Sequence, residues 1–249
     1  MIKFVVLFFT GIIAGFINTL AGGGSVLVLP VLILAGLPSP IANATNRVAI
    51  FIQNVTATHR FHKHRELNIK PVIHISIAAV IGSIIGSMFA VKVDSATFDK
   101  ILGIVFLGIL ILMLRPHKSK NRFTKKLPKW VEVTIFLAVG FYGGFIQAGV
   151  GFIFLATLNL IEEFNLIKAN AVKVFIIMCY TFFAVIIFTI SGKIIWKFGL
   201  ILAAGNMIGA YLGVKAAIRK GEKFVKIVLS AAIIIACFKL FGILKYIGL

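Results

Sequence analysis

The chain of 249 residues is 60% apolar and only 13% charged, whereas a soluble domain carries about 25% charged residues. This composition excludes a soluble globular protein and predicts an all-α polytopic membrane protein. The net charge of +19 does not indicate nucleic-acid binding, because the basic residues lie between apolar segments and not along one face.

Eight apolar segments follow one another, and a transmembrane helix needs about 20 such residues. The first and fifth are too long for one helix and carry glycine clusters near their middles, at residues 22–24 and 149–151. Since glycine costs about 1 kcal/mol in a helix interior, we expect both segments to be broken there. The segments are residues 4–36, 40–59, 71–91, 98–114, 131–160, 166–190, 194–214 and 224–247.

Two sequence patterns recur at one fixed offset. IGSIIG at 81–86 returns as IGAYLG at 208–213, and IANATN at 41–46 returns as KANAVK at 168–173, so both offsets are 127 residues (208 − 81 and 168 − 41). A shared offset indicates an internal duplication. It predicts two repeats of four segments, residues 1–114 and residues 131–249, joined by a basic linker at 115–130.

The distribution of Lys and Arg predicts the orientation in the membrane. The loop at 115–129 has seven basic residues and the loop at 60–70 has four, whereas the turn at 92–100 is balanced by acids. If the first and fifth segments each cross the bilayer once, the positive-inside bias makes both basic loops and both termini cytoplasmic. Four crossings per repeat then make the two repeats parallel, and the basic turn at 215–226 is the one exception.

The second segment carries a polar stripe. Its members recur at steps of three and four residues, so they share roughly one helix face. Such a stripe either bonds neighbouring helices or lines a cavity, and five polar residues favour the cavity. The members are Asn43, Asn46, Arg47, Gln53 and Asn54.

Two basic residues lie deep in predicted spans. Arg47 is in the second segment and Lys173 is at a similar depth in the sixth. A charge inside a span costs at least about 2.5–3.5 kcal/mol, so it needs a partner or a cavity. We expect that partner to be a bound anion; the alternatives are that both side chains reach the interface or bond backbone carbonyls.

Acidic residues are absent from the predicted membrane interior. All seven lie in loops or at segment ends, which argues against a proton, sodium or metal-ion carrier and against a membrane hydrolase. His74 and His59 remain candidates for carrying a proton. No cysteine or histidine cluster indicates a metal, so we expect no cofactor. The acids are Glu66, Asp94, Asp99, Glu132, Glu162, Glu163 and Glu222.

The two glycine clusters predict anion sites. A half-helix that begins near Ser25 presents free N–H groups and the positive end of its dipole, and residues 149–151 repeat this arrangement. Asn18 and Gln147 precede the two clusters and add amide donors. Alternatively, the glycines allow close helix packing, a role that Gly11 with Gly15 and Gly82 with Gly86 fit better.

The run GIIAGFINTLAGGGSVLVLPVLILAGL at 11–37, followed by ANATN at 42–46, resembles the signatures of the TauE/SafE family of membrane transporters. The resemblance covers the full length, since that family is also a duplicated four-span unit. It implies a multi-pass anion transporter, named for sulfite and organosulfonate export. The second half departs from the signatures at Phe152, Thr157, Val172 and Lys173.

We therefore expect a transporter, not an enzyme, that exports a small sulfur-containing or organic anion by alternating access between two repeats. An anion channel and a membrane-embedded enzyme or accessory subunit are the alternatives. The expected partners are the anion and the lipid bilayer; nucleic acid is not one, and the oligomeric state stays open. The candidate binding residues are Asn18, Gly22, Gly23, Gly24, Ser25, Asn43, Thr45, Asn46, Arg47, Gln53, Gln147, Gly149, Gly151, Asn170 and Lys173.

Overall fold

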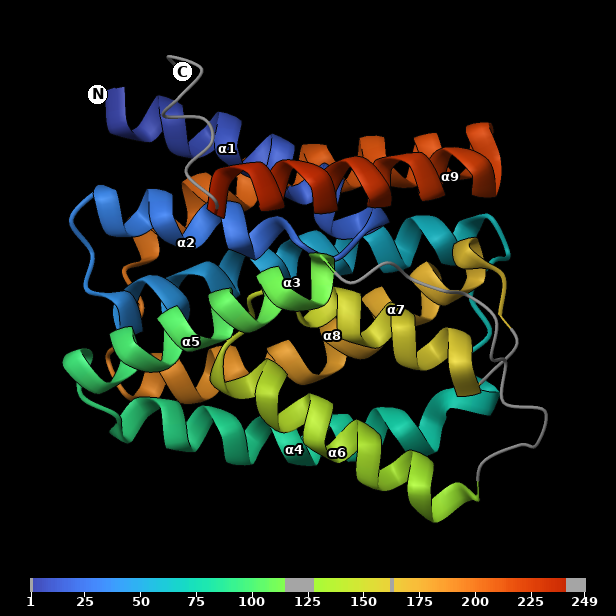
Figure 1. Ribbon diagram of the computed structural model, residues 1–249, viewed down its shortest axis with the longest axis horizontal. Coiled ribbons are helices and arrows are strands. Elements are labelled where there is room, and N and C mark those ends of the chain that lie inside the picture. The colour runs from blue at the N-terminus through green and yellow to red at the C-terminus, as the bar shows by residue number, and fades with distance from the viewer. Residues whose placement is uncertain (1, 115–127, 162–163, 241–249) are drawn as a thin grey trace.

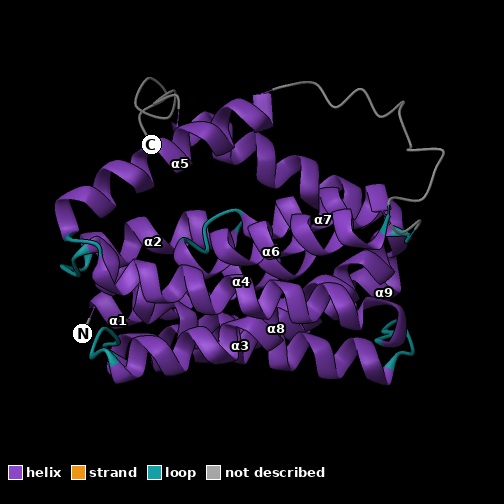
Figure 2. Cartoon of the chain, turned by 90° about the horizontal axis from the view of Figure 1, so that it is seen from below, coloured by secondary structure: helices purple, strands orange, loops and turns teal. Residues whose placement is uncertain are grey.

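The computed structural model describes residues 2–114, 128–161 and 164–240, and within these ranges it is all-helical, with no strand (Figure 1, Figure 2). The helices lie side by side in one bundle. They are α1 (Ile2–Leu20), α2 (Gly24–Leu34), α3 (Ser39–Lys63), a short 3-10 helix (Lys70–Val72), α4 (Ile73–Lys92), α5 (Ser95–Leu114), α6 (Lys129–Phe145), α7 (Val150–Ile161), α8 (Leu166–Ile190) and α9 (Trp196–Leu240).

Four helical stretches in the described part of the chain are long and apolar enough to cross a bilayer: 2–20, 70–92, 166–190 and 196–221. Large apolar side chains such as Ile2, Phe89 and Ile190 are exposed on them, as expected for contact with lipid. The 25-residue helix α3 is long enough but carries the polar stripe, which dilutes its apolar character. The count of eight spans stays a prediction.

Both predicted breaks are confirmed. Helix α1 ends at Leu20 and α2 begins at Gly24, with Gly22 at a φ of 89° between them. Helix α6 ends at Phe145 and α7 begins at Val150, with Gly149 at a φ of 72°. A positive φ is readily adopted only by glycine, which explains why glycine stands at these two turns.

Each break reverses the chain, so each broken segment is a hairpin. Lys3 at the start of α1 donates a hydrogen bond to the carbonyl of Ala35 after α2, at 3.4 Å. In the second half, Val133 of α6 and Leu158 of α7 pack in one cluster with Val72, so α6 begins and α7 ends at the same end of the bundle (Figure 1). The prediction that each broken segment crosses once is therefore wrong.

Helices α1 and α6 run in opposite directions. Helices α1, α3 and α9 start together, since Phe4 packs on Phe198 with ring centroids 5.4 Å apart and Ile195 N donates to Thr45 Oγ1 at 3.1 Å. Helix α6 starts at the other end, beside the start of α4 (Figure 1). His74 of α4 contacts Glu132 of α6 there. The predicted parallel orientation of the two halves is wrong for this reason.

Two pairs of parallel helices pack closely at glycine residues and hold the two halves of the chain together. Gly11 of α1 faces Leu202 of α9, where an added Cβ would lie 2.6 Å from the carbonyl oxygen. In the equivalent pair, a Cβ on Gly82 of α4 would collide with the carbonyl of Leu137 in α6. The predicted packing role of these glycines is confirmed, and each pair joins a helix of the first half to one of the second.

The predicted turn at 215–226 is confirmed in position but is narrower than predicted, because helix continues through residue 220 and the chain turns at Gly221. Helix α9 departs from helical geometry at Gly221, with a φ of 71°, and then runs back toward the end where it began (Figure 1). Lys and Arg are good helix formers whose charges extend to the interface while the backbone stays helical, which explains the longer helix.

The bundle therefore has two ends that we name by their contents. The terminal face holds Lys3, Ala35 and Ile195. The basic face lies at the opposite end and holds the loop at 64–69 (Figure 1). The turn at Gly221 lies there too, since Phe61 of α3 and Ala217 of α9 belong to one core cluster.

Candidate functional site

A pocket lies between the two breaks. Its cavity volume is about 10 Å³, room for about one water molecule. Both halves of the chain contribute to it, so a ligand larger than water fits only when the two halves move apart. Its lining is Asn18, Gly22, Ile50, Gln53, Asn54, Gln147, Val150, Gly151 and Ile177.

The two breaks touch each other at this pocket. A Cβ on Gly22 would collide with the backbone of Gly151, and a Cβ on Gly23 would overlap the ring of Phe152. Irregular backbone at membrane depth is tolerated where it is buried in protein or lines a cavity. Here it does both, and only glycine allows so close an approach.

Amide side chains line the pocket from both halves. Asn18 Nδ2 donates to Gln53 Oε1 at 3.2 Å, and Asn206 Nδ2 donates to the same oxygen at 3.1 Å. In the second half, Gln147 Nε2 donates to the hydroxyl of Tyr180 at 3.0 Å. Asn18 Oδ1 also accepts from Gly24 N at 2.7 Å, so one side chain connects the broken end of α1 to the first turn of α2.

Arg47 caps the broken end of α6. Its side chain is 0% exposed and extends from α3 across to the other half of the chain. Nη1 donates to Gly143 O and, at 2.5 Å, to Gln147 Oε1, while Nη2 donates to Gly144 O at 2.9 Å. The last carbonyls of a helix have no partner within it and bear about half a negative charge, so a guanidinium satisfies both needs.

Lys173 caps the broken end of α1 in the same way. It is 0% exposed on α8, and its Nζ donates to Asn18 O at 2.9 Å, to Thr19 O at 3.1 Å and to Asn170 Oδ1 at 2.6 Å. Neither cation reaches the interface. The backbone-carbonyl alternative describes these contacts, and the expected bound anion stays a prediction.

Two further predicted residues, Asn43 and Asn46, contact the helices at the breaks. Asn43 Nδ2 donates to Phe145 O at 3.0 Å, and Asn46 Nδ2 donates to Ser25 Oγ at 3.3 Å. Thr45 lies instead at the start of α9, bonded to Ile195 N. The structure thus brings Asn18, Gly22, Gln53, Gln147 and Gly151 into the pocket and leaves the other predicted residues outside its lining.

Sequence reasoning missed Tyr180 and Asn206 at the network, and Ile50, Val150 and Ile177 in the lining. The fixed offset was a usable signal, because Tyr180 lies 127 residues after Gln53 (180 − 53) and Ile177 lies 127 after Ile50 (177 − 50). Asn54 belonged to the predicted stripe but not to the predicted site. Nothing in the sequence pointed to Asn206, which follows a glycine on α9.

Several buried polar atoms at the site have no hydrogen-bond partner among the described residues. They are available to a ligand or to water, because a buried polar atom left unpaired is costly. At the site they are Asn43 Oδ1, Asn46 Oδ1, Arg47 Nε, Asn54 Oδ1, Asn170 Nδ2 and Asn206 Oδ1.

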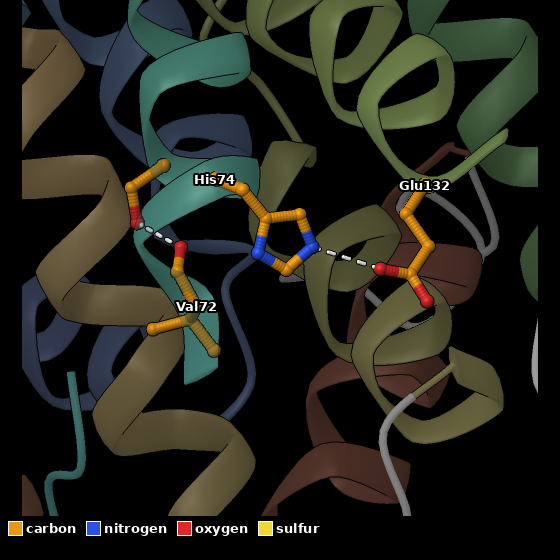
Figure 3. A network of polar contacts seen from close by, with 4 residues as sticks. Val72, His74 and Glu132 are labelled. Atoms are coloured by element: carbon orange, nitrogen blue, oxygen red, sulfur yellow. Dashed lines mark hydrogen bonds and ion pairs between the residues drawn. The ribbon is translucent and has the colours of Figure 1, made fainter. Parts of the chain in front are cut away.

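The buried carboxylate of Glu132 lies away from the pocket, in the first turn of α6 at the basic face. Figure 3 shows His74 of α4 pointing toward it, with His74 Nε2 2.9 Å from Glu132 Oε2. In the same turn Ser76 Oγ donates to Val72 O at 2.7 Å. This pair joins the starts of α4 and α6, and the described part of the chain holds no group of three or more His, Cys, Asp or Glu that could bind a metal ion.

The family model described as "Sulfite exporter TauE/SafE" matches residues 7–240. The chain belongs to the TauE/SafE sulfite exporter family. This membership and the apolar helices make it a multi-pass membrane protein of a transporter family.

Curated relatives of this TauE/SafE member carry the same kind of name. A "Probable membrane transporter protein" of Haemophilus influenzae is 29% identical over 223 residues, covering 89% of this chain and 88% of the relative. The "Probable membrane transporter protein YfcA" of Escherichia coli K12 is 28% identical over 224 residues, covering 89% and 83%. A Sinorhizobium protein, "Probable membrane transporter protein ORF9", is 27% identical over 222 residues, covering 88% and 85%. No solved structure is a significant match to the chain.

Proposed function

We propose that this TauE/SafE member exports a small sulfur-containing or organic anion, such as sulfite or a sulfonate, through the pocket between its two breaks. One observation carries the proposal: the pocket lies between two buried cations and is lined by amide groups, with no carboxylate in its lining. The positive charges of Arg47 and Lys173 attract an anion and repel a cation. Arg47 Nε and Asn170 Nδ2 are donors at the site that have no partner among the described residues.

The helix arrangement supports transport by alternating access. We infer that residues 1–114 and 131–249 are two inverted repeats, each formed by a broken hairpin followed by three crossings. In transporters with inverted repeats, the substrate site lies near the bilayer midplane where discontinuous helices of both repeats meet. The contact between Gly22 and Gly151 has this character.

The hairpins also change the inferred orientation. The loop at 60–70, the basic stretch at 215–226 and the start of α6 at Lys129 all belong to the basic face. With hairpins in place of single crossings, the stretch at 215–226 is no longer an exception to the positive-inside bias. We therefore propose that the basic face is cytoplasmic and that both termini lie outside, which replaces the cytoplasmic termini of the sequence prediction.

Sided labelling tests this orientation. In a background with Cys179→Ser and Cys237→Ser, we expect an impermeant maleimide to label Lys3→Cys on intact cells, because the terminal face is outside. Arg65→Cys, on the basic face, should react only after permeabilisation. The reverse pattern would restore cytoplasmic termini.

Flux into and out of proteoliposomes tests the transport proposal. Each elementary charge gains about 2.3 kcal/mol per 100 mV, so a potential of 100 mV should drive a monovalent anion to a concentration ratio of about 50 without a sodium or proton gradient. We expect labelled sulfite to leave vesicles that are held negative inside by potassium and valinomycin. Flux that ignores the potential would contradict electrogenic export, and single-channel currents would indicate a channel.

A further inference from the structure

The two buried cations form a crossed pair. Arg47 belongs to the first half and caps α6 of the second, whereas Lys173 belongs to the second half and caps α1 of the first. They act at opposite ends of the pocket. The Arg47 guanidinium lies 5.6 Å from the ring centroid of Phe188, near the terminal face, and the capped end of α1 packs through Leu20 in a cluster with Phe61, near the basic face.

Both contacts end on residues that also line the pocket. Gln147 accepts from Arg47 Nη1 at 2.5 Å, and Asn18 accepts from Lys173 Nζ through its carbonyl at 2.9 Å. An anion in the pocket would therefore lie one residue away from either cation. Arg47 Nε has no partner among the described residues, so the guanidinium has a donor to spare for such an anion.

We propose that Arg47 and Lys173 are two latches that close opposite faces of the pocket and that an anion opens one latch at a time by competing for its cation. A helix end offers a cation about half a negative charge, and an anion offers a full charge or more. Withdrawal of the cation leaves the helix end uncapped and free to move. The inference rests on the proposed function, since alternating access requires one face to be closed while the other is open.

Cysteine labelling from each side tests the latches without any measurement of transport. The probe is Ile50→Cys in the pocket, in the background with Cys179→Ser and Cys237→Ser, treated with a membrane-impermeant thiosulfonate in right-side-out and inside-out vesicles. We expect Arg47→Gln to raise the labelling rate from the terminal face by about tenfold. Loss of the charged cap makes the closed state of that face less stable, and the labelling rate follows the fraction of molecules in which the face is open. Lys173→Gln should do the same from the basic face, and each variant should leave the other face at the parental rate.

The matched controls are Arg47→Lys and Lys173→Arg, which keep a cation at each helix end and should restore most of the parental pattern. Thermal unfolding of each purified variant identifies a change that acts through misfolding. Equal labelling of the two glutamine variants from both faces, or parental rates in both, would overturn the latch and leave static caps. Because labelling needs no substrate, failure of sulfite flux with the asymmetric pattern intact would reject only the assigned substrate.

Discussion

Lys173→Ala is expected to lower sulfite efflux by about 100-fold or more and to destabilise the protein. The change leaves Asn18 O, Thr19 O and Asn170 Oδ1 without their shared donor in a fully buried place. Each buried group left unsatisfied costs about 1–3 kcal/mol, and two such groups already amount to about a 100-fold effect on an equilibrium. The same change removes a positive charge beside the pocket, which lowers anion affinity.

Initial efflux rates and thermal unfolding of the purified variants measure these effects. Lys168→Ala is the matched control, because Lys168 is exposed on the same helix and should leave both quantities at parental values. Lys173→Arg should recover part of the efflux. Asn43→Ala, which removes a single bond to Phe145 O, should weaken anion binding by about tenfold or less. Parental efflux in Lys173→Ala would remove this lysine from the transport site.

Gly22→Ala is expected to abolish transport and to lower the stability of the fold by more than about 3 kcal/mol. Two costs add at this position. The φ of 89° strains any residue with a Cβ, and the Cβ would collide with the backbone of Gly151 and push the two breaks apart. Backbone on both sides of the contact leaves no side chain that can move away.

Substitutions at two other glycines separate the cost of backbone strain from the cost of the collision. Gly36 also has a positive φ, of 100°, but no atom lies within 4 Å of its added Cβ, so Gly36→Ala should cost about 1 kcal/mol from strain alone. Gly103 lies in α5 with open space around it, so Gly103→Ala should be neutral or stabilise the helix by up to about 1 kcal/mol. Melting temperatures and efflux of the three variants measure the order. A Gly22→Ala protein that melts and transports like Gly103→Ala would show that the breaks need not touch.

The positions of the breaks could be predicted from sequence because glycine in a long apolar segment has a local cost. Whether the chain crosses the bilayer or turns back after a break could not be predicted from the sequence. A segment of about 30 residues with a central break can kink and cross or turn back, and its composition is the same in both cases. The φ angles of Gly22 and Gly149 and the contact between Lys3 and Ala35 decide for reversal. The orientation of the whole second half depends on that single choice.

For the two buried cations, too, the sequence predicts one part and the tertiary structure decides the other. Their depth and the absence of nearby acids followed from sequence, because the cost of a buried charge demands a partner wherever it lies. The identity of the partner is a tertiary fact, since the carbonyls that hold Arg47 lie 96 and 97 residues away along the chain, on Gly143 and Gly144. Every residue carries a carbonyl, so no pattern of side chains marks the ones left unpaired at a broken helix end.

By itself, then, the sequence determined that this protein is a bundle of apolar helices with two glycine breaks, two deep cations and a stripe of amides, and it predicts a duplication. Tertiary structure alone decided that the breaks reverse the chain, that they meet at one pocket, and that each cation caps a helix of the opposite half. The physical reason is how far apart along the chain the interacting residues lie. Helix breaking and charge burial are costs that a residue incurs with its neighbours, whereas chain direction and capping partners depend on which distant backbone packs against it.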